Sequence, residues 1–331
     1  MKQVKINFVD FWPGFEKTNN YFYNLLIQKY QLCISDDPEL IFYSFFGSEY
    51  LNYKCIRIYY TGENIRPDFT GCDYALSFDY VFNSSHYRLP LYKLWINTPY
   101  NHDDNRKSIE ELIFHRNRED LKIEWNKKKK FCCIVVSNPA SQKRLDFFVK
   151  LSKYKQVDSG GRTLNNIGGP VEDKMEFIKD YRFVISFENA EYPGYTTEKI
   201  IQPMFVDSIP IYWGNPLVGK DFNKKRFLNY SDFDTEEDLI KRILEIEDNP
   251  EMAIAMISEP VFPDNKIPEC IKDENILQFL EEIIERVGIR TPVAKSYKRY
   301  IHPFNRIILR VKRGVGPILF RIKLFFKTGY K

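Results

Sequence analysis

The feature of this sequence that most constrains its fold is an alternation of short apolar runs with amphipathic stretches, which occurs twice along the chain. In the first half, residues 18–30 carry apolar side chains at helical spacing. Runs rich in β-branched and aromatic residues, typical of strands, lie on both sides of this stretch. These runs are Val4–Val9, Leu40–Phe46, Cys55–Tyr60 and Tyr74–Phe78. Strands that alternate with helices predict an α/β fold.

The second half restarts this alternation after a basic cluster at residues 127–130. We expect strands at Phe131–Val136, Phe183–Phe187 and Ile209–Trp213, and helices at Ser141–Tyr154, Met175–Tyr181 and Thr196–Phe205. A length of 331 residues fits two domains. The sequence therefore predicts two Rossmann-like domains facing a central cleft, with ligands at the carboxyl ends of the strands. We place these domains at residues 1–125 and 126–290, followed by a tail at residues 291–331.

Charge separates the tail from the body of the chain. The net charge of the whole chain is +4, but residues 291–331 contain 11 Lys and Arg residues and no acidic residue. Residues 1–290, the body of the chain, therefore carry a net charge of −7. An acidic body argues against nucleic acid as a partner. In the tail, apolar residues recur at helical spacing between the basic ones, which is typical of an amphipathic helix on an anionic membrane surface. The alternative, a helix docked on the acidic body, stays open.

Cysteine and histidine spacing gives no sign of a metal site. The six Cys residues form no CxxC pair, and the four His residues show no metal-binding spacing. The element Asp232-Phe233-Asp234 resembles the DxD of metal–nucleotide sites, but we interpret Asp234 as a helix N-cap with Glu237 three residues on. The N-terminus lacks the apolar stretch of a signal peptide, and we expect a cytoplasmic protein with reduced cysteines.

The densest group of polar residues follows the second strand of the second half. Glu188 and Asn189 end that strand, and Glu198 and Lys199 open the next helix, for which Thr196 is the expected N-cap. A helix N-terminus presents free N–H groups and a partial positive charge, which suits a phosphate. The alternative is an ordinary capped helix.

Two other polar residues follow strands. Arg144 falls early in a helix, and its guanidinium is suited to a phosphate, although a lone arginine there is more often a surface charge. Glu63 lies in a loop of the first half and matters to the chemistry only if it faces the phosphate site across the cleft. Trp12 and Tyr21 are candidates for stacking on a sugar, although aromatic residues are more often part of the core.

Together these segments resemble the α1,3/α1,4-fucosyltransferases, glycosyltransferase family 10, particularly the bacterial members that make Lewis-type structures. The motifs, which run in order through about residues 55–260, are YYTGEN (59–64), DYALSFD (73–79), YRLPLY (87–92), SNP (137–139), VDSGG (157–161), FEN–Y–TEK (187–199) and IPIYWGNP (209–216). The resemblance implies a GT-B type fold, GDP-fucose as donor, inversion at the anomeric carbon and no essential metal or other cofactor. The implied acceptor is an oligosaccharide or lipid-linked glycan, as in a Lewis antigen or a lipopolysaccharide O-antigen, attacked through O3 of GlcNAc or a related sugar.

The resemblance also assigns roles to individual residues. Glu63 of the TGEN motif is the implied general base. Arg144 and Lys199 are implied to bind the GDP phosphates. The implied lining of the donor site is Asn189, Tyr195 and Glu198, and the implied donor loop contains Ser137, Gly160 and Gly161.

Family members with similar basic tails are peripheral membrane proteins. The resemblance therefore implies that residues 291–331 attach the chain to the inner face of the cell membrane. The leucine-rich heptad repeats that related bacterial enzymes carry before such a tail are absent from this sequence. Two alternatives stay open: a GT-B glycosyltransferase that uses another nucleotide sugar, and a catalytically inactive, membrane-associated glycan-binding protein.

Overall fold

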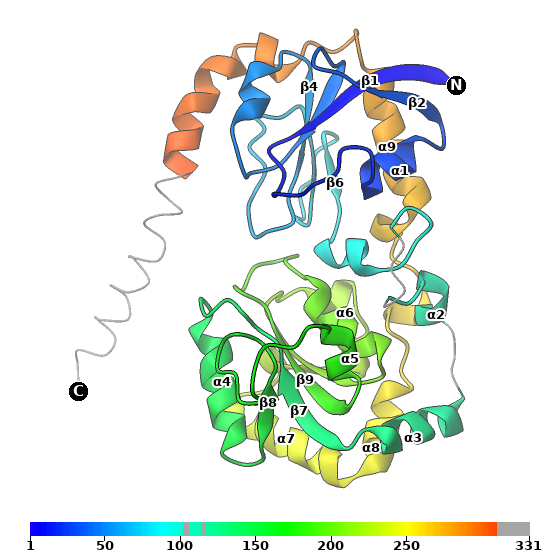
Figure 1. Ribbon diagram of the computed structural model, residues 1–331, viewed down its shortest axis with the longest axis vertical. Helices are drawn as coiled ribbons and strands as arrows, with labels where there is room; N and C mark the ends of the chain where they lie inside the picture. The colour runs from blue at the N-terminus through cyan, green and yellow to red at the C-terminus, as the bar shows by residue number, and fades with distance from the viewer. Residues whose placement is uncertain (102–105, 114–116, 310–331) are drawn as a thin grey trace, which may run out of the picture.

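The computed structural model describes residues 1–101, 106–113 and 117–309, which form two α/β domains stacked along the long axis of the molecule (Figure 1). Each domain is built on a parallel sheet, and the two sheets share one strand order. Counted along each domain, the order is 2-1-3-4-5, with a sixth strand at the end of the first sheet. This doubly wound order defines a Rossmann-like domain and confirms the predicted fold class.

The first sheet has the spatial order β2-β1-β3-β4-β5-β6. Its strands are β1 (Lys2–Val9), β2 (Tyr30–Ile34), β3 (Leu40–Tyr43), β4 (Ile56–Tyr60), β5 (Tyr74–Ser77) and β6 (His86–Arg88). The N-cap of helix α1 (Tyr21–Leu26) is Asn20, whose side chain accepts a hydrogen bond from the N–H of Tyr23. Strands β1, β3, β4 and β5 confirm the four predicted strands. The two edge strands were not predicted, because β2 begins where the helical pattern ends and β6 has only three residues.

One helix from the far end of the chain completes the first domain. Helix α9 (Asp273–Glu285) packs its apolar side chains, among them Ile276 and Leu280, into the core beneath the first sheet (Figure 1). We predicted this segment in the second domain, because its apolar stripe is visible in the sequence but the sheet that receives it is not. The predicted boundary at 125 also falls inside a helix, α3 (Arg118–Lys127), whose Trp125 is buried in the second core.

The second sheet has the order β11-β10-β9-β7-β8. Its strands are β7 (Lys130–Ile134), β8 (Val157–Ser159), β9 (Tyr181–Phe187), β10 (Ile209–Trp213) and β11 (Leu228–Asn229). Between β6 and α9 the chain also forms α2 (Ile109–Ile113), α4 (Gln142–Ser152), α5 (Lys174–Ile178), α6 (Glu198–Phe205), α7 (Glu236–Asp248) and α8 (Pro250–Ile257). Strands β7, β9 and β10 and helices α4, α5 and α6 confirm the predicted elements. The N-cap of α7 is Thr235, whose hydroxyl accepts from the N–H of Asp238, so the prediction of Asp234 was wrong by one residue.

The tail is described as far as residue 309, and residues 310–331 of the predicted tail lie outside the described residues. Residues 298–309 form a helix beside the first domain (orange in Figure 1), and His302 of this helix is buried against it. Tyr297, Tyr300, Phe304 and Ile307 are instead 61–70% exposed. The helix therefore docks on the body and still presents apolar side chains to the surroundings. Within the described residues, no helix combines the length and the apolar character needed to cross a membrane.

Candidate active site

The second domain gathers polar groups at the carboxyl ends of β7 and β9, the neighbouring strands between which the order of the sheet reverses. Ligands of doubly wound sheets bind at such a point. Arg144 comes from the first turn of α4, and Asn189 follows β9. Nη1 of Arg144 donates to Oδ1 of Asn189 over 3.1 Å, and its Nη2 donates to the carbonyl of Asn138 over 2.6 Å. The structure thus brings together two of the predicted donor-site residues.

Neutral groups hold the Arg144 side chain in place. It is 1% exposed, and Nη1 also donates to the carbonyl of Phe187 over 3.3 Å. Burial lowers the pKa of Arg144 and the Glu188 carboxylate opposes this shift, but a guanidinium stays protonated in proteins. Its Nε has no hydrogen-bond partner among the described residues. A charged guanidinium with a spare donor is suited to an anionic ligand.

A second group of charges lies at the N-terminus of α6. The N-cap of this helix is Thr197 rather than the predicted Thr196. Oε1 of Glu188 accepts from the Thr197 N–H over 2.7 Å, and the Thr197 hydroxyl donates to Oε2 of Glu188 over 2.8 Å. Thr196 is buried, and its hydroxyl accepts from Nδ2 of Asn215 over 2.9 Å. The Glu188 carboxylate, which directly follows strand β9, therefore accepts the hydrogen bonds at the N-terminus of α6 and stabilises the positive end of this helix.

Lys199 adds a full positive charge to this helix N-terminus. Its Nζ lies 3.2 Å from Oε2 of Glu188 and 3.4 Å from Oε1 of Glu198. Burial alone would lower the pKa of Lys199, but the two carboxylates outweigh burial and raise it. For Glu198, burial alone would raise the pKa, but the positive charges of Lys199 and Lys174 outweigh burial and lower the pKa. Lys199 and Glu198 are therefore both charged at neutral pH.

Tyr195, predicted to line the donor site, packs between the two domains. It is 1% exposed, and its ring centroid lies 5.3 Å from that of Phe78 in the first domain. The adjacent Gly194 has φ of +87°, and a Cβ there would lie 2.3 Å from the carbonyl oxygen of Phe78. Glycine is therefore required for the close approach of the two domains at this point.

The predicted donor loop lies next to the end of β7. A Cβ on Gly161 would lie 1.9 Å from the carbonyl oxygen of Val136, and one on Gly160 would lie 2.8 Å from the Phe177 ring. Gly161 therefore lets the segment after β8 approach the chain that follows β7, and Gly160 leaves room for the Phe177 ring of α5. Ser137 is exposed beyond the end of β7. These three residues therefore share one edge of the sheet with Arg144.

The first domain contributes Glu63 from the loop that follows β4. The Thr61 hydroxyl accepts from the N–H of Glu63 over 3.0 Å and donates to its carbonyl over 2.9 Å, which fixes the backbone there. The exposed Glu63 side chain lines a cleft of about 620 Å³ together with Thr197 and Glu198 of the other domain. Partial burial raises the pKa of Glu63, while the charge of Lys199 acts in the opposite direction. The predicted general base therefore faces the charged N-terminus of α6.

An aromatic wall lines the first-domain side of this cleft, at the carboxyl ends of β1 and β3 and on the 3₁₀ helix Leu91–Trp95. Trp12, Phe46 and Trp95 are its most exposed members, at 42, 50 and 36%. Trp12 was a candidate from the sequence, whereas the other two were missed. The signal that would have found Phe46 is its position after β3, since the order of the first sheet also reverses between β1 and β3. Tyr21 is buried and donates a hydrogen bond to Asp273.

The arrangement defines a class of enzyme. Within the described residues, no three His, Cys, Asp or Glu side chains come together as a metal site requires. On the second-domain side the cleft is lined by Thr197 and Glu198 at the N-terminus of α6, beside the ammonium of Lys199, whereas the buried Arg144 is not among the lining residues. Two Rossmann-like domains facing one cleft, with fixed cations on one side and a carboxylate on the other, are the features of a GT-B type glycosyltransferase.

The chain belongs to glycosyltransferase family 10, the fucosyltransferases. Residues 6–95 match the family model of the alpha-(1,3)-fucosyltransferase FucT N-terminal domain. Residues 125–255 match the model of the glycosyltransferase family 10 (fucosyltransferase) C-terminal part. The two matches correspond to the two domains of the structure and confirm the resemblance found in the sequence.

Individual relatives agree with this assignment. The alpha-(1,3)-fucosyltransferase FucT of Helicobacter pylori is 34% identical over 321 residues, which are 85% of this chain and 66% of that protein. The chain thus spans about two thirds of the length of that relative. Crystal structures of an alpha1,3-fucosyltransferase with GDP-fucose and with GDP, both 31% identical, superpose with TM-scores of 0.71 and 0.69. Each superposition includes 86% of this chain and 91% of the crystallised chain.

Proposed function

We propose that this protein transfers L-fucose from GDP-fucose to a hydroxyl of a glycan acceptor, with inversion and with Glu63 as the general base. The observation that carries the proposal is the cleft that Glu63 shares with the N-terminus of α6. Family membership and the GDP-fucose complex of the solved relative support the identity of the donor.

Each step of the transfer has a group to assist it. As the acceptor oxygen bonds to the anomeric carbon, its proton passes to the Glu63 carboxylate. The bond from that carbon to the β-phosphate oxygen breaks, and GDP leaves with the electron pair. Arg144, Lys199 and the free N–H groups of α6 stabilise the developing phosphate charge, and no cofactor is proposed. Attack from the face opposite the leaving group turns a β-linked donor into an α-linked product.

The expected magnitudes follow from these roles. A positioned general base contributes roughly 10²–10⁴-fold to rate. A group aimed at developing charge contributes roughly 10²–10³-fold. The raised pKa of Glu63 makes its carboxylate a stronger base than an ordinary glutamate. Glu63, Arg144 and Lys199 are therefore the side chains whose loss should reduce transfer most.

The acceptor is proposed to bind against the aromatic wall of the first domain. Exposed aromatic rings suit the C–H faces of sugars, and a cleft of about 620 Å³ is in the range of sites that enclose drug-sized ligands. A disaccharide or longer unit fits this description, and we propose O3 of GlcNAc or a related sugar as the attacking hydroxyl. Such a glycan belongs to a Lewis-type or O-antigen structure.

We further propose that the tail attaches the enzyme to the inner, cytoplasmic face of the cell membrane. Support comes from the exposed side chains of Tyr297, Tyr300, Phe304 and Ile307 and from the 11 basic residues of the tail. Each basic residue near an anionic surface contributes about 1 kcal/mol. Attachment would bring the cleft to lipid-linked acceptors.

A panel of nucleotide sugars tests the function. Purified protein is incubated with GDP-fucose, GDP-mannose and UDP-sugars and a β-galactosyl-GlcNAc acceptor, and product formation is followed. We expect transfer from GDP-fucose alone, and we expect Glu63→Gln to abolish transfer while GDP still binds. Turnover with a different nucleotide sugar, or glycan binding that Glu63→Gln leaves unchanged without any turnover, would replace the proposal by one of the two alternatives.

A further inference from the structure

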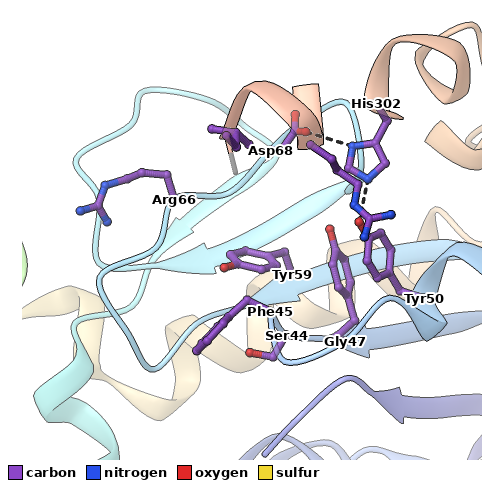
Figure 2. A pocket seen from close by; sticks show the side chains of 11 residues that line it. Ser44, Phe45, Gly47, Tyr50, Tyr59, Arg66, Asp68 and His302 are labelled. Carbon is purple, nitrogen blue, oxygen red and sulfur yellow. Dashed lines mark hydrogen bonds and ion pairs between the residues drawn. The ribbon is translucent and has the colours of Figure 1, made fainter. Parts of the chain in front are cut away.

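The helix of residues 298–309 contacts the loop that carries Glu63. This loop, residues 61–70, leads from β4 toward β5, and its second half lies beside the helix (Figure 2). Three side chains of the helix form hydrogen bonds to it. They are His302 to Asp68, Asn305 to Thr70, and Lys298 to the carbonyl of Phe69.

His302 is the centre of this contact. Its Nδ1 lies 2.9 Å from Oδ2 of Asp68, and its Nε2 lies 2.7 Å from the hydroxyl of Tyr50 (Figure 2). Burial alone would raise the pKa of Asp68, but hydrogen bonds from His302 and Thr70 outweigh burial and lower the pKa to about 2. An ionised carboxylate only accepts hydrogen bonds, so Nδ1 carries the proton toward Asp68. In the neutral ring Nε2 then accepts from Tyr50, and both nitrogens are satisfied.

The imidazole of His302 is buried and packs closely against the first domain. Among residues 297–309, all of which are described, His302 alone is buried, with 5% of its surface exposed. A Cβ on Gly71 would lie 2.2 Å from Cε1 of His302, so a larger residue there displaces the ring. The Arg306 guanidinium, one turn further along the helix, lies 5.7 Å from the centre of the Tyr50 ring. The helix is thus fixed to the first domain chiefly through one buried side chain.

The same loop is anchored on the side of the donor site. The guanidinium of Arg66 lies 3.4 Å from the centre of the Tyr192 ring, which belongs to the segment between β9 and α6. Arg66 also forms an ion pair of 3.1 Å with Asp79. The loop therefore places Glu63 in the cleft. Its Arg66 contacts Tyr192, between β9 and α6, and its Asp68 contacts His302 of the helix of residues 298–309.

We propose that His302 is a positioning residue for Glu63. By holding Asp68, the tail helix sets the path of the loop and thereby the place of the Glu63 carboxylate in the cleft. The proposal rests on the proposed role of Glu63 as general base. It gives residues 298–309 a part in catalysis that is separate from membrane attachment. Misplacement of a reacting group by about 1 Å can cost ~10²-fold in rate, so a small movement of the loop is sufficient.

The test uses the full chain, GDP-fucose and a short soluble acceptor without membranes. We expect His302→Ala to lower kcat about 10- to 100-fold. The KM for GDP-fucose and the Kd for GDP should stay within about twofold, because no donor-site group is touched. His302→Asn, whose amide can still donate to Asp68, should recover a large part of the lost kcat. Gly71→Ala, which displaces the ring while keeping the histidine, should reproduce the kcat loss.

The matched control is Pro303→Ala, which changes the adjacent, exposed residue of the same helix and should leave kcat unchanged. Three results would overturn the proposal: a wild-type kcat in His302→Ala, a parallel fall of kcat and GDP affinity, or an Asn variant as impaired as the Ala variant. A wild-type protein that transfers no fucose would instead overturn the proposed function, so the two failures are distinct.

Discussion

Replacing Lys199 by methionine tests whether the cation of the donor site is also the partner of a buried carboxylate. Glu188 is 0% exposed, and its Oε2 lies 3.2 Å from Nζ of Lys199. Methionine removes the charge and keeps most of the side-chain length. Removing one partner of a buried ion pair costs about 3–5 kcal/mol of unfolding free energy. We expect the lower end, about 3 kcal/mol, because Thr197 continues to donate hydrogen bonds to the carboxylate.

This loss depends on pH, because Glu188 can take up a proton. Burial raises the pKa of Glu188 even with Lys199 beside it, and the pKa rises further when that charge is removed. A raised pKa means that the folded protein binds more protons than the unfolded chain, so stability falls as pH rises through that pKa. The stability difference between Lys199→Met and the wild type should therefore be largest at neutral pH. It should narrow as pH falls toward the ordinary glutamate pKa of about 4.3.

Equilibrium unfolding in urea at a series of pH values measures this effect, and GDP titration measures the other role of Lys199. Adding Glu188→Gln to Lys199→Met removes the unpaired charge and should restore most of the stability. GDP affinity should stay about 10- to 150-fold below wild type, because a charged hydrogen bond contributes about 1.5–3 kcal/mol. Equal unfolding free energies for the single and double variants would refute the pairing with Glu188. Recovery of GDP binding in the double variant would refute the phosphate contact.

Further predictions concern the base, the acceptor and the tail. The raised pKa of Glu63 places the acid limb of the kcat/KM profile above the pH at which an ordinary glutamate titrates. In Glu63→Asp, which keeps a carboxylate, that limb should persist at lower activity; a flat acid profile in the wild type would contradict this role. Trp12→Ala and Trp95→Ala should each raise the acceptor KM about tenfold and leave the KM for GDP-fucose unchanged, whereas an unchanged acceptor KM in both would exclude the aromatic wall as the acceptor site. Phe304→Asp should reduce sedimentation with anionic phosphatidylserine vesicles without lowering transfer to a soluble acceptor, and wild-type sedimentation of that variant would count against attachment through the described helix.

Much of the fold was predictable because the central strands of parallel sheets are buried on both faces. Strands β3 and β4 are buried along their whole length, so they read as continuous apolar runs. The edge strands β2 and β6 are partly exposed, and β6 has only three residues, so their sequences differ little from loops. The place of α9 could not be predicted, because an amphipathic helix shows that it needs a partner but not which sheet provides it.

The candidate site was predictable to the extent that it depends on strand ends. Arg144, Asn189 and Lys199 each follow a strand whose position the sequence indicates, and parallel strands place their carboxyl ends at one edge. The N-cap of α6 was not predictable, because Thr196 and Thr197 have the same chemistry and only the tertiary contact of Thr197 with Glu188 distinguishes them. The aromatic wall remained hidden because an aromatic residue beside a cleft has the same sequence pattern as one in a core.

Both domains place their functional groups at the point where the strand order reverses, but the first domain presents aromatic side chains there and the second presents cations. In the second domain the cations are held before any donor arrives, since Glu188 and Asn189 already contact Lys199 and Arg144. Charges held in place need no reorganisation when the phosphate charge develops, which favours the transition state. In the proposed mechanism the Glu188 carboxylate fixes the ammonium of Lys199 in place, and it weakens the attraction of Lys199 for the phosphates in the ground state and in the transition state alike. A cation that is already in place where charge develops can raise kcat, so we expect Glu188 to act on transfer through its contact with Lys199.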